Sequence, residues 1–472
     1  MNSQWKAIAA TGLVMATVLS GVVTGDAAQA REKGHRRHGS AKVEMNGGAR
    51  SSGASIHANS LWGCNEGESG GEAVCEGELI LGLEPGTDAN AVAAQLGLQL
   101  IDRIPSLNAV LFASSTSINL STAIDAAESI NGVQWADVNS VDFTSDPRRI
   151  NISPRRINIS ATAGLLAANS QQAAAQQAAV DVNGAMSCAA NDGAGATVAV
   201  IDTGLHLSHP MFAGHVAGAW NAFNQSGDVS DMGNGIDEGA LTGADEGAGH
   251  GTHVAGIVMQ VAPGATIMPV KAIDDEGRGQ AWVIAKAIAH AADNGADVIN
   301  LSLGSTDRSR VIEAAVSSAL SQNVFVAAAG GNTRDAANKV GLTEWPAAMG
   351  DVSGVAASDS VSGSATAGQL ATFSSRYAKL DIAAPGVDIV SAFPNGAQGL
   401  NSDYASWSGT SMATPWVAGT AALVIADHPG TAADHIDDAM MAAADRLANT
   451  SSNPTKGLKE LDAAGTVCGY HE

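Results

Sequence analysis

The sequence predicts an α/β protein in which a parallel sheet is flanked by helices in three layers, preceded by a small α+β domain. From Ala196 onward, short apolar runs alternate with segments of helical periodicity, which is typical of a parallel sheet covered by helices. Residues 78–142 instead follow the order β-α-β-β-α-β. The 472 residues are also too many for one ordinary domain, so we expect at least two folded parts.

The first folded part is expected to be ferredoxin-like, because that arrangement has the same order of elements. Its strands are predicted at residues 78–83, 100–104, 109–113 and 133–142, and its helices at 89–98 and 121–131.

The second part should hold the functional site. Strands are predicted at 197–201, 266–272, 298–303, 324–329 and 380–384, and helices at 250–260, 281–294, 309–322, 411–427 and 431–444. In parallel sheets of this kind, ligands bind beyond the carboxyl ends of the strands. Polar residues that follow a predicted strand are therefore the first candidates.

The composition is that of a globular, strongly acidic protein. Hydrophobic residues make up 45% of the chain, and the formal net charge is -23. From Ala161 onward there are 12 Lys and Arg against 31 Asp and Glu, which gives -19 for that part. Nucleic-acid binding is therefore not expected, and a surface of this charge favours a soluble monomer.

The N-terminus resembles a secretory signal peptide. Lys6 precedes an apolar run from Ala7 to Val23, and the small residues Ala28 and Ala30 form a cleavage site. The alternative is a membrane anchor, but the run is short and contains Thr, Gly and Ser. We expect cleavage after Ala30, secretion to the extracellular space and no membrane association afterwards.

The sequence divides into five segments. Residues 1–30 are the expected signal peptide, 31–76 a flexible Gly-, Ser- and His-rich lead-in, 77–145 the α+β domain, 146–175 a linker, and 176–472 the larger domain. The linker contains the heptapeptide PRRINIS twice in succession, at 147–153 and 154–160. Its prolines and paired arginines indicate an exposed segment, where proteolytic processing is expected.

The four cysteines fit two disulfides in an exported protein. Cys64 and Cys75 precede the larger domain, and Cys188 and Cys468 lie near its two ends. Three pairings are possible, of which Cys188 with Cys468 would tie those ends together. Free thiols are the alternative, whereas a metal site is disfavoured because the cysteines are single and far apart.

Three motifs place catalytic side chains after predicted strands or at helix starts. Asp202 follows an apolar strand and precedes Thr and Gly, His250 opens a helix between glycines, and Ser411 begins another helix. Each alone has an ordinary explanation as a turn residue, a core histidine or a helix cap. Together they supply the nucleophile, the base and the orienting carboxylate of acyl transfer, in the order Asp, His, Ser. These arguments leave His250 and His253 as alternatives.

The stretches VAVIDTG, GHGTHVAGI and GTSMATP resemble the three signature motifs of the subtilisin (subtilase) family. The resemblance covers residues 175–465, and residues 78–143 resemble the family's inhibitory propeptide. It implies a subtilisin-like fold and a secreted serine endopeptidase. Such an enzyme acts through an acyl-enzyme and is made as a self-processed preproenzyme.

The resemblance also implies roles for individual residues. Asp202 is the orienting acid, His250 the general base and then acid, and Ser411 the nucleophile, which leaves His253 a structural neighbour. Asn332 would complete the oxyanion hole with the Ser411 N–H. Two departures are the doubled glycine before Asn332, where the family has one, and Trp416, where it commonly has histidine. We expect the tryptophan to change packing but not activity.

Substrate binding is expected along residues 302–304. By resemblance, Ser302, Leu303 and Gly304 pair with an extended peptide as an added strand, while the alternative is an ordinary buried strand end. Gly341 is expected beside the specificity pocket. Protein or peptide substrates and the chain's own propeptide, acting as an intramolecular inhibitor, are the expected partners.

Calcium is the expected cofactor, with a structural role. The oxygen-bearing residues of a Gly-rich loop before His250 are its candidate ligands: Asp228, Asp231, Asn234, Asp237 and Glu238. The alternative is a solvated acidic loop.

Two other functions remain open. One is a binding module that keeps the fold without the activity, although no triad residue is missing. The other is a dedicated maturation protease with one partner, which would show a narrow cleavage preference among unrelated proteins.

Overall fold

The computed structural model describes residues 64–65, 73–115, 118–143, 173–234, 245, 247–334, 341–360, 368–399, 402–447 and 457–470. All of them belong to one compact unit, Ser55–Glu472. The expected signal peptide, most of the lead-in and the repeated heptapeptides lie outside the described residues. Within the described part, no helix combines the length and the apolar character needed to cross a membrane.

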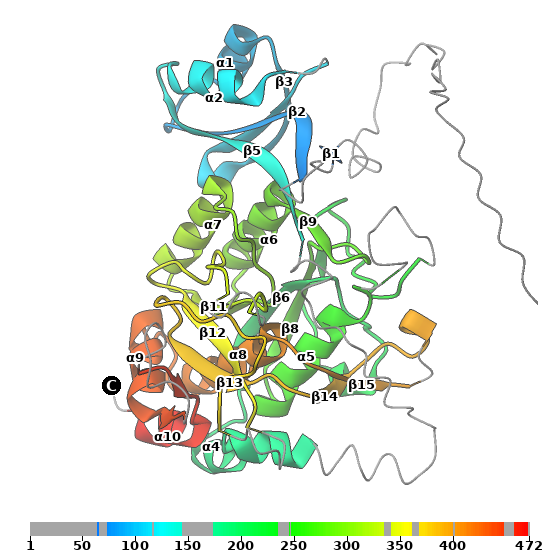
Figure 1. Cartoon of the computed structure of the whole chain (residues 1–472), viewed down its shortest axis with the longest axis vertical. Helices are drawn as coiled ribbons and strands as arrows, with labels where there is room; N and C mark the ends of the chain where they lie inside the picture. Colours follow the sequence, from blue (N-terminus) through cyan, green and yellow to red (C-terminus); the bar gives the residue numbers. More distant parts are fainter. Residues whose placement is uncertain are drawn as a thin grey trace, which may run out of the picture. The chain divides into compact units, whose positions relative to one another are not determined.

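The α+β domain is ferredoxin-like, as predicted (Figure 1). Its elements are β2 (Ala73–Leu83), α1 (Ala89–Leu96), β3 (Gln99–Ile104), the 3-10 turn η2 (Pro105–Leu107), β4 (Ala109–Ala113), α2 (Leu120–Glu128) and β5 (Val133–Phe143). The strands lie in the order β3-β4-β2-β5, and all neighbours are antiparallel. The short β1 (Cys64–Asn65) extends the sheet, with Cys64 as the backbone partner of Cys75, which is disulfide-bonded.

Strand alternation gives this sheet two different faces. Leu79 and Leu81 pack into the domain's own core with Phe112. Ile80 points the other way and joins a core that contains Trp282 of the larger domain. Because successive residues of a strand point to opposite faces, β2 helps to build both cores.

The larger domain is built on a nine-stranded sheet in the order β16-β17-β13-β12-β11-β10-β6-β8-β7. Its strands are β6 (Thr197–Asp202), β7 (Trp220–Asn221), β8 (Thr266–Lys271), β10 (Val298–Leu301), β11 (Phe325–Ala329), β12 (Ser353–Ser358), β13 (Ile382–Pro385), β16 (Asp445–Arg446) and β17 (Lys459–Glu460). Every neighbouring pair is parallel except β16 and β17. Separate from it are β9 (Arg278–Gln280), which pairs with β5, and the hairpin of β14 (Ile389–Ala392) and β15 (Tyr404–Trp407).

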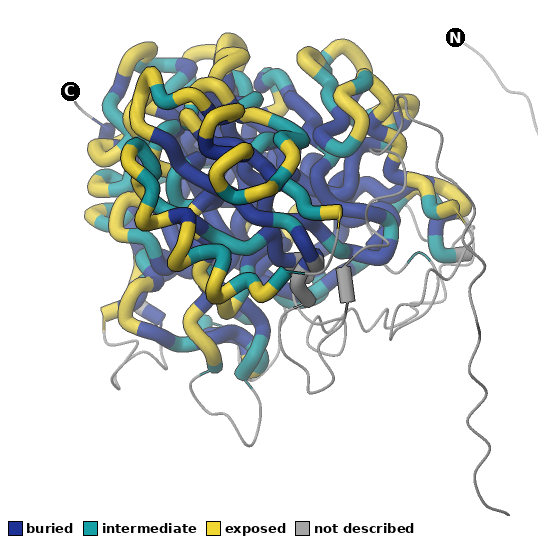
Figure 2. Tube along the Cα trace, turned by 90° about the horizontal axis from the view of Figure 1, so that it is seen from above, coloured by how far each residue is buried: buried dark blue, intermediate teal, exposed yellow. Residues whose placement is uncertain are grey.

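Helices cover both faces of this sheet, which confirms the predicted three layers (Figures 1 and 2). They are α4 (Val182–Cys188), α5 (His250–Val261), α6 (Ala281–Asp293), α7 (Arg310–Ser321), α8 (Thr410–Asp427), α9 (Ala433–Ala443) and α10 (Ala463–Gly469), with 3-10 turns η3 (Pro210–Phe212) and η4 (Ala397–Gly399). In β6, Val198 and Val200 pack with α5 and α8, whereas Ala199 and Ile201 pack with α6 and α7. Burial on both sides explains why the four residues 198–201 are all apolar.

Two features of the larger domain bear on the sequence predictions. The Cys188–Cys468 disulfide is present and joins α4 to α10, which selects this pairing from the three that the sequence left open. The strand predicted at 298–303 ends at Leu301, so that the next three residues leave the sheet.

Candidate active site

Asp202 and His250 are joined at the carboxyl end of β6. The Nδ1 atom of His250 lies 2.7 Å from Oδ1 of Asp202, and both side chains are buried. The same carboxylate oxygen accepts a 2.7 Å hydrogen bond from the Thr203 N–H. Because Nδ1 carries the proton toward Asp202, Nε2 of the neutral ring is left as the basic nitrogen.

Glycines make this approach possible. A Cβ atom on Gly251 would lie 2.3 Å from the Gly204 carbonyl oxygen, and one on Gly249 would lie 2.3 Å from the Phe393 ring. Gly249 also has a φ of +89°, which favours glycine. The glycines on either side of His250 therefore let α5 begin directly against the Asp202 loop.

His253, the alternative histidine of the same helix, makes the contacts of a structural residue. Its Nε2 lies 3.1 Å from two carbonyl oxygens, those of Ile389 and Ala405, and its ring stacks on Trp407. Burial, and secondly the nearby His250, lower its pKa to about 3. This neutral ring ties α5 to the β14–β15 hairpin through Nε2, and its complete burial keeps both ring nitrogens away from a substrate.

The pKa of His250 is raised above its ordinary value of 6.5. Burial alone would lower this pKa, but the negative charge and hydrogen bond of Asp202, together with the charge of Asp231, outweigh burial. The site is therefore arranged to stabilise an imidazolium ion.

Ser411 lies in the first turn of α8, which packs against α5. Pro415 has no N–H to donate to the Ser411 carbonyl one turn earlier, and the Ser302 hydroxyl donates to that carbonyl instead, at 2.8 Å. The Ser411 hydroxyl in turn donates to the Ser302 carbonyl at 3.1 Å. The candidate nucleophile is thus held beside the segment predicted to bind substrate.

Asn332 is oriented by Thr410. Its Oδ1 accepts hydrogen bonds from the Thr410 N–H at 2.9 Å and from the Thr410 hydroxyl at 3.2 Å. A backbone N–H can only donate, so the oxygen must face Thr410 and Nδ2 must face away. A Cβ atom on Gly409 would lie 3.5 Å from that Nδ2 and 3.7 Å from the Ser411 nitrogen. Both donors therefore lie close to the same small space beside Gly409.

The doubled glycine before Asn332 has a packing reason. A Cβ on Gly330 would lie 2.4 Å from the Leu380 side chain, and one on Gly331 would lie 2.0 Å from a carboxylate oxygen of Glu344. Gly331 also has a φ of +94°. Both positions therefore need glycine, and the buried glutamate responsible for the second could not be recognised from the sequence pattern.

The residues predicted to bind substrate lie next to this centre. Ser302, Leu303 and Gly304 are buried and follow the end of β10. Gly341 lies against Ser375, because a Cβ there would lie 2.6 Å from the Ser375 hydroxyl. That hydroxyl lies 2.9 Å from Thr333 Oγ1, and Thr333 follows Asn332.

Trp416 lies on α8 and is fully buried in the core on the side of the sheet that α5 and α8 cover. Its indole Nε1 makes no hydrogen bond with any residue in the described ranges. The tryptophan thus fills core volume behind the site, which agrees with its expected role in packing.

Asp231 has a role other than the calcium ligand that was predicted. Its Oδ1 accepts from the Thr203 hydroxyl at 2.6 Å and the Gly249 N–H at 3.0 Å, and its Oδ2 accepts from the N–H and hydroxyl of Thr252 at 2.8 and 2.5 Å. These bonds use both oxygens of a fully buried carboxylate. We therefore correct the assignment: Asp231 fastens the start of α5 to the Asp202 loop.

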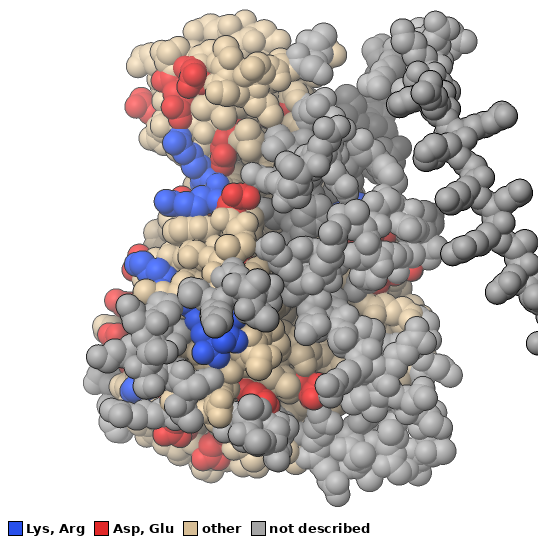
Figure 3. Space-filling view, in the orientation of Figure 1, with Lys and Arg blue, Asp and Glu red and all other residues tan. Residues whose placement is uncertain are grey.

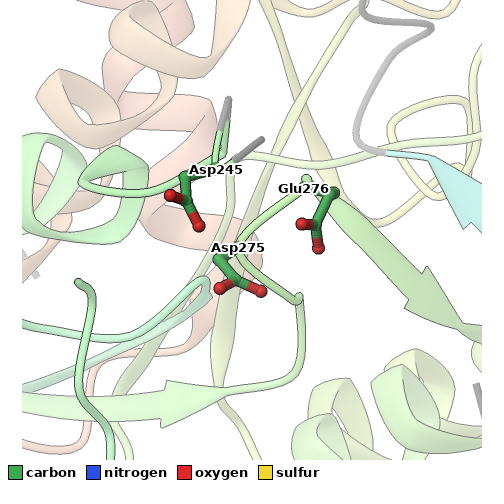
Figure 4. A group of neighbouring side chains, drawn as sticks. All are labelled: Asp245, Asp275 and Glu276. Carbon is green, nitrogen blue, oxygen red and sulfur yellow. The ribbon is translucent and has the colours of Figure 1, made fainter. Parts of the chain in front are cut away.

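Another group of carboxylates is better placed to hold a cation. Oxygen atoms of Asp245, Asp275 and Glu276 all lie within 4.8 Å of one another, and Figure 4 shows the three side chains close together. Asn234 reaches this group through its N–H, which donates to Asp275 at 2.9 Å. Of the other predicted ligands, Asp228 is exposed and bonds to the Ser230 N–H. Asp237 and Glu238 lie outside the described residues.

Comparisons with known proteins identify both domains. Residues 193–460 match the Subtilase family, and residues 65–139 match the Fervidolysin N-terminal prodomain family. The chain belongs to the subtilase family. The resemblance inferred from the sequence motifs is therefore confirmed, and this subtilase is a subtilisin-like serine protease with a propeptide.

Individual relatives of this subtilase agree with that assignment. Thermitase of Thermoactinomyces vulgaris is 36% identical over 276 residues, which are 56% of this chain and 87% of thermitase. Subtilisin E of Bacillus subtilis is 36% identical over 282 residues, 58% of this chain and 66% of subtilisin E. Among solved structures, fervidolysin from Fervidobacterium pennivorans, a keratinolytic enzyme related to subtilisin, has the same fold, with a TM-score of 0.64 at 22% identity. That match covers 86% of this subtilase but only 62% of the fervidolysin chain.

The propeptide of this subtilase contacts the larger domain at two helix starts. Asn139 accepts a 3.1 Å hydrogen bond from the Trp282 N–H at the start of α6, and Asp137 accepts a 2.6 Å bond from the Arg310 N–H at the start of α7. Orphan N–H groups and the helix dipole make such positions suited to oxygen acceptors.

Ion pairs and strand pairing add to this interface. Asp102 lies 2.5 Å from the Lys286 amine, and β5 pairs with β9 in an antiparallel ladder. On the face drawn in Figure 3, basic side chains lie beside acidic ones in a few groups.

Proposed function

We propose that this chain is a secreted serine endopeptidase whose triad is Asp202, His250 and Ser411. The observation that carries the proposal is the buried 2.7 Å hydrogen bond between Asp202 and His250. His250 begins α5, which packs against α8, and Ser411 lies in the first turn of α8.

The proposed reaction is acyl transfer. Ser411 Oγ leaves its bond to Ser302, gives its proton to His250 Nε2 and attacks the peptide carbonyl. Asn332 Nδ2 and the Ser411 N–H donate to the oxygen that becomes negative. His250 then protonates the leaving amine, and water releases the acyl group by the same steps in reverse. In subtilisin itself, loss of one oxyanion donor costs about a hundredfold or more in rate.

The substrate is proposed to bind as an added strand along Ser302, Leu303 and Gly304, with Gly341 near the pocket. Leu301, the last residue of β10, immediately precedes this segment, so the segment is fixed at one end by the sheet. Cleavage would then occur where the added strand passes the Ser411 hydroxyl.

The propeptide is proposed to act as an intramolecular inhibitor until the linker at 146–175 is cut. Its support is the interface at α6 and α7, where Asp137 and Asn139 accept hydrogen bonds from the two helix starts. The proposed segments include a signal peptide at 1–30 and a mature enzyme that begins within the linker, between residues 149 and 175.

Calcium is proposed as a structural ion. Carboxylate and carbonyl oxygens are the ligands that Ca²⁺ prefers, and Asp245, Asp275 and Glu276 fit that preference. Its proposed role is to fix the segment just before His250. If so, a chelator should shorten the half-life of the enzyme at elevated temperature, and excess Ca²⁺ should restore it.

The test is the full-length Ser411→Ala precursor, expressed in a host that lacks other extracellular proteases. We expect it to remain unprocessed and inactive, whereas Ser321→Ala, which alters an exposed serine at the end of α7, should be processed and active. A fluorophosphonate should label wild-type protein at Ser411 and leave Ser411→Ala unlabelled. Normal processing of Ser411→Ala, or no labelling of the wild type, would favour a binding module with this fold.

A further inference from the structure

Lys271 is a charged residue at the candidate active site that the proposed mechanism does not use. It ends β8, and its Cα partner in the neighbouring strand β6 is Asp202. Paired residues of adjacent strands point to the same face of a sheet. Ile267, four residues earlier in β8, packs in the core that α5 covers. The Lys271 side chain therefore leaves the sheet on the same face as the Asp202 carboxylate and the start of α5.

Thr203 links Lys271 to this centre. The Lys271 ammonium donates a hydrogen bond to the Thr203 carbonyl. The Thr203 N–H donates to Asp202 Oδ1 at 2.7 Å. Its hydroxyl donates to Asp231 at 2.6 Å and accepts from the Gly251 N–H at 2.9 Å. Every polar group of this buried threonine thus has a partner, and Lys271 is the one that holds the carbonyl.

Lys271 also balances charge at the centre. Asp202 and Asp231 place two buried carboxylates near His250, and buried charges of one sign are costly unless an opposite charge compensates them. The ammonium group of Lys271 supplies one positive charge. The centre therefore has one net negative charge while the imidazole is neutral, and it becomes balanced when His250 takes the proton of Ser411.

The negative charge of Asp231 depends on Lys271. Burial raises the pKa of the Asp231 carboxyl, and the positive charge of Lys271 is the largest effect that lowers this pKa. Hydrogen bonds from Thr203 and Thr252 lower it further. The charge of Asp231 in turn helps to raise the pKa of His250. Lys271 is thereby connected to the proposed base through Asp231.

The groups that neighbouring elements present here are neutral apart from the Asp202–His250 pair. On β7, the Cα partner of Lys271 is Asn221, whose amide donates to the Asp228 carbonyl at 2.8 Å. On α5, Thr252 contacts Asp231 through its N–H and its hydroxyl. Of the described cations, Lys271 therefore has the largest effect on Asp231.

We propose that Lys271 is a positioning residue, which holds the Asp202 loop through the Thr203 carbonyl and keeps Asp231 negatively charged. The inference rests on the proposed peptidase function. Two routes from Lys271 to His250 predict opposite results when the lysine is lost. If Lys271 acts through Asp231, as we propose, Asp231 takes up a proton and the His250 pKa falls. If Lys271 only repelled the imidazolium ion directly, the His250 pKa would rise.

The test is the pH dependence of kcat/KM for the processed enzyme, measured with one peptide substrate. In Lys271→Met, the acidic limb should move by about one pH unit to lower pH, and kcat should fall with little change in KM. Lys271→Arg should keep the midpoint of the wild type, because it keeps the charge. Adding Lys271→Met to Asp231→Asn should cause no further shift, because position 231 then has no charge to maintain.

Lys459→Met is the matched control. Lys459 lies in β17 of the same sheet, and its ammonium also donates to a backbone carbonyl, that of Met441, at 2.8 Å. This variant should leave the midpoint unchanged. If Lys271→Met does not fold, Lys271→Gln takes its place, since it keeps a donor for the Thr203 carbonyl but has no charge, and it should show the same shift.

Three results would overturn the proposal. They are an unchanged midpoint without the charge at position 271, a midpoint that moves to higher pH, and an equal shift in the presence and absence of the Asp231 carboxylate. A different midpoint in Lys271→Arg would also contradict it. If the wild type cleaves no peptide at any pH, the proposed peptidase function fails instead.

Discussion

Ser302 and Ser411 exchange two hydrogen bonds, one from each hydroxyl to the other residue's carbonyl oxygen. The pair links the end of β10 to the first turn of α8. It exists because Pro415 leaves the Ser411 carbonyl without its usual helical donor. The Asn300 side chain extends the link by donating to the Ser302 hydroxyl at 3.0 Å.

Ser302→Ala should therefore lower kcat by about tenfold, equivalent to about 1.4 kcal/mol, with little change in KM. The backbone proposed to bind substrate is kept, whereas the Ser411 carbonyl loses its partner and the nucleophile is held less firmly. Steady-state kinetics on one peptide substrate measure the effect. Ser305→Ala is the control, because its hydroxyl accepts from the Asp307 N–H and makes no hydrogen bond with Ser411 in the described residues. A variant with unchanged kcat would show that the pair has no role in positioning.

The pH dependence of kcat/KM should reflect the raised pKa of His250. The ring must be neutral to accept the Ser411 proton, so activity is lost as the pH falls through that pKa. Because Asp202 and Asp231 raise the pKa above 6.5, the midpoint of the acidic limb should lie on the alkaline side of pH 6.5. A midpoint clearly below that value would contradict the electrostatic account of the site.

Asp231→Asn should shift that acidic limb to lower pH and also destabilise the enzyme. The shift follows because one of the charges that raise the His250 pKa is removed. The loss of stability should be about 1–3 kcal/mol, because each carboxylate oxygen of Asp231 accepts a hydrogen bond from a backbone N–H. The amide nitrogen of asparagine cannot accept such a bond, so one N–H would lose its partner. Asp228→Asn, at an exposed carboxylate three residues earlier, should change neither the pH profile nor the unfolding temperature. If Asp231→Asn and the wild type had the same pH profile, Asp231 would have only a structural role.

Asp137→Ala should shorten the time that the precursor remains inhibited after the linker is cut. The substitution leaves the Arg310 N–H at the start of α7 without its 2.6 Å acceptor. Bonds to charged groups contribute about 1.5–3 kcal/mol, so the propeptide should bind at least tenfold more weakly. The lag before peptidase activity in a full-chain preparation measures this, with Asp125→Ala on the exposed face of α2 as the control. Equal lags for both variants would argue against inhibition through this helix start.

Most of the fold could be predicted from periodicity. β6 reads as an uninterrupted apolar strand because helices cover both of its faces, and α8 reads as a helix up to Asp427. β12 was not predicted, since its sequence Ser-Gly-Val-Ala-Ala-Ser has only one branched apolar residue. Its place in the sheet depends on its neighbours β11 and β13 rather than on its own β propensity.

The residues of the candidate site that belong to sequence motifs could be predicted, whereas the residues whose role depends on packing could not. Asp202, His250 and Ser411 stand in motifs that can be read directly, and the contacts of the buried His253 with two carbonyl oxygens are consistent with the choice of His250 as the proposed base. The role of Asp231 could not be read, because an aspartate in a Gly-rich loop also fits a metal ligand. The contact of Glu344 with Gly331 could not be predicted, because it depends on how the chain folds and not on a sequence motif.

The Cys188–Cys468 bond has a consequence for an enzyme that meets other copies of itself. The two cysteines are 280 residues apart, and Asp202, His250 and Ser411 all lie between them. A single internal cut by a neighbouring molecule would leave two fragments that are still covalently attached. A nicked molecule would therefore keep its parts together, whereas the fragments of an unlinked chain would diffuse away from each other.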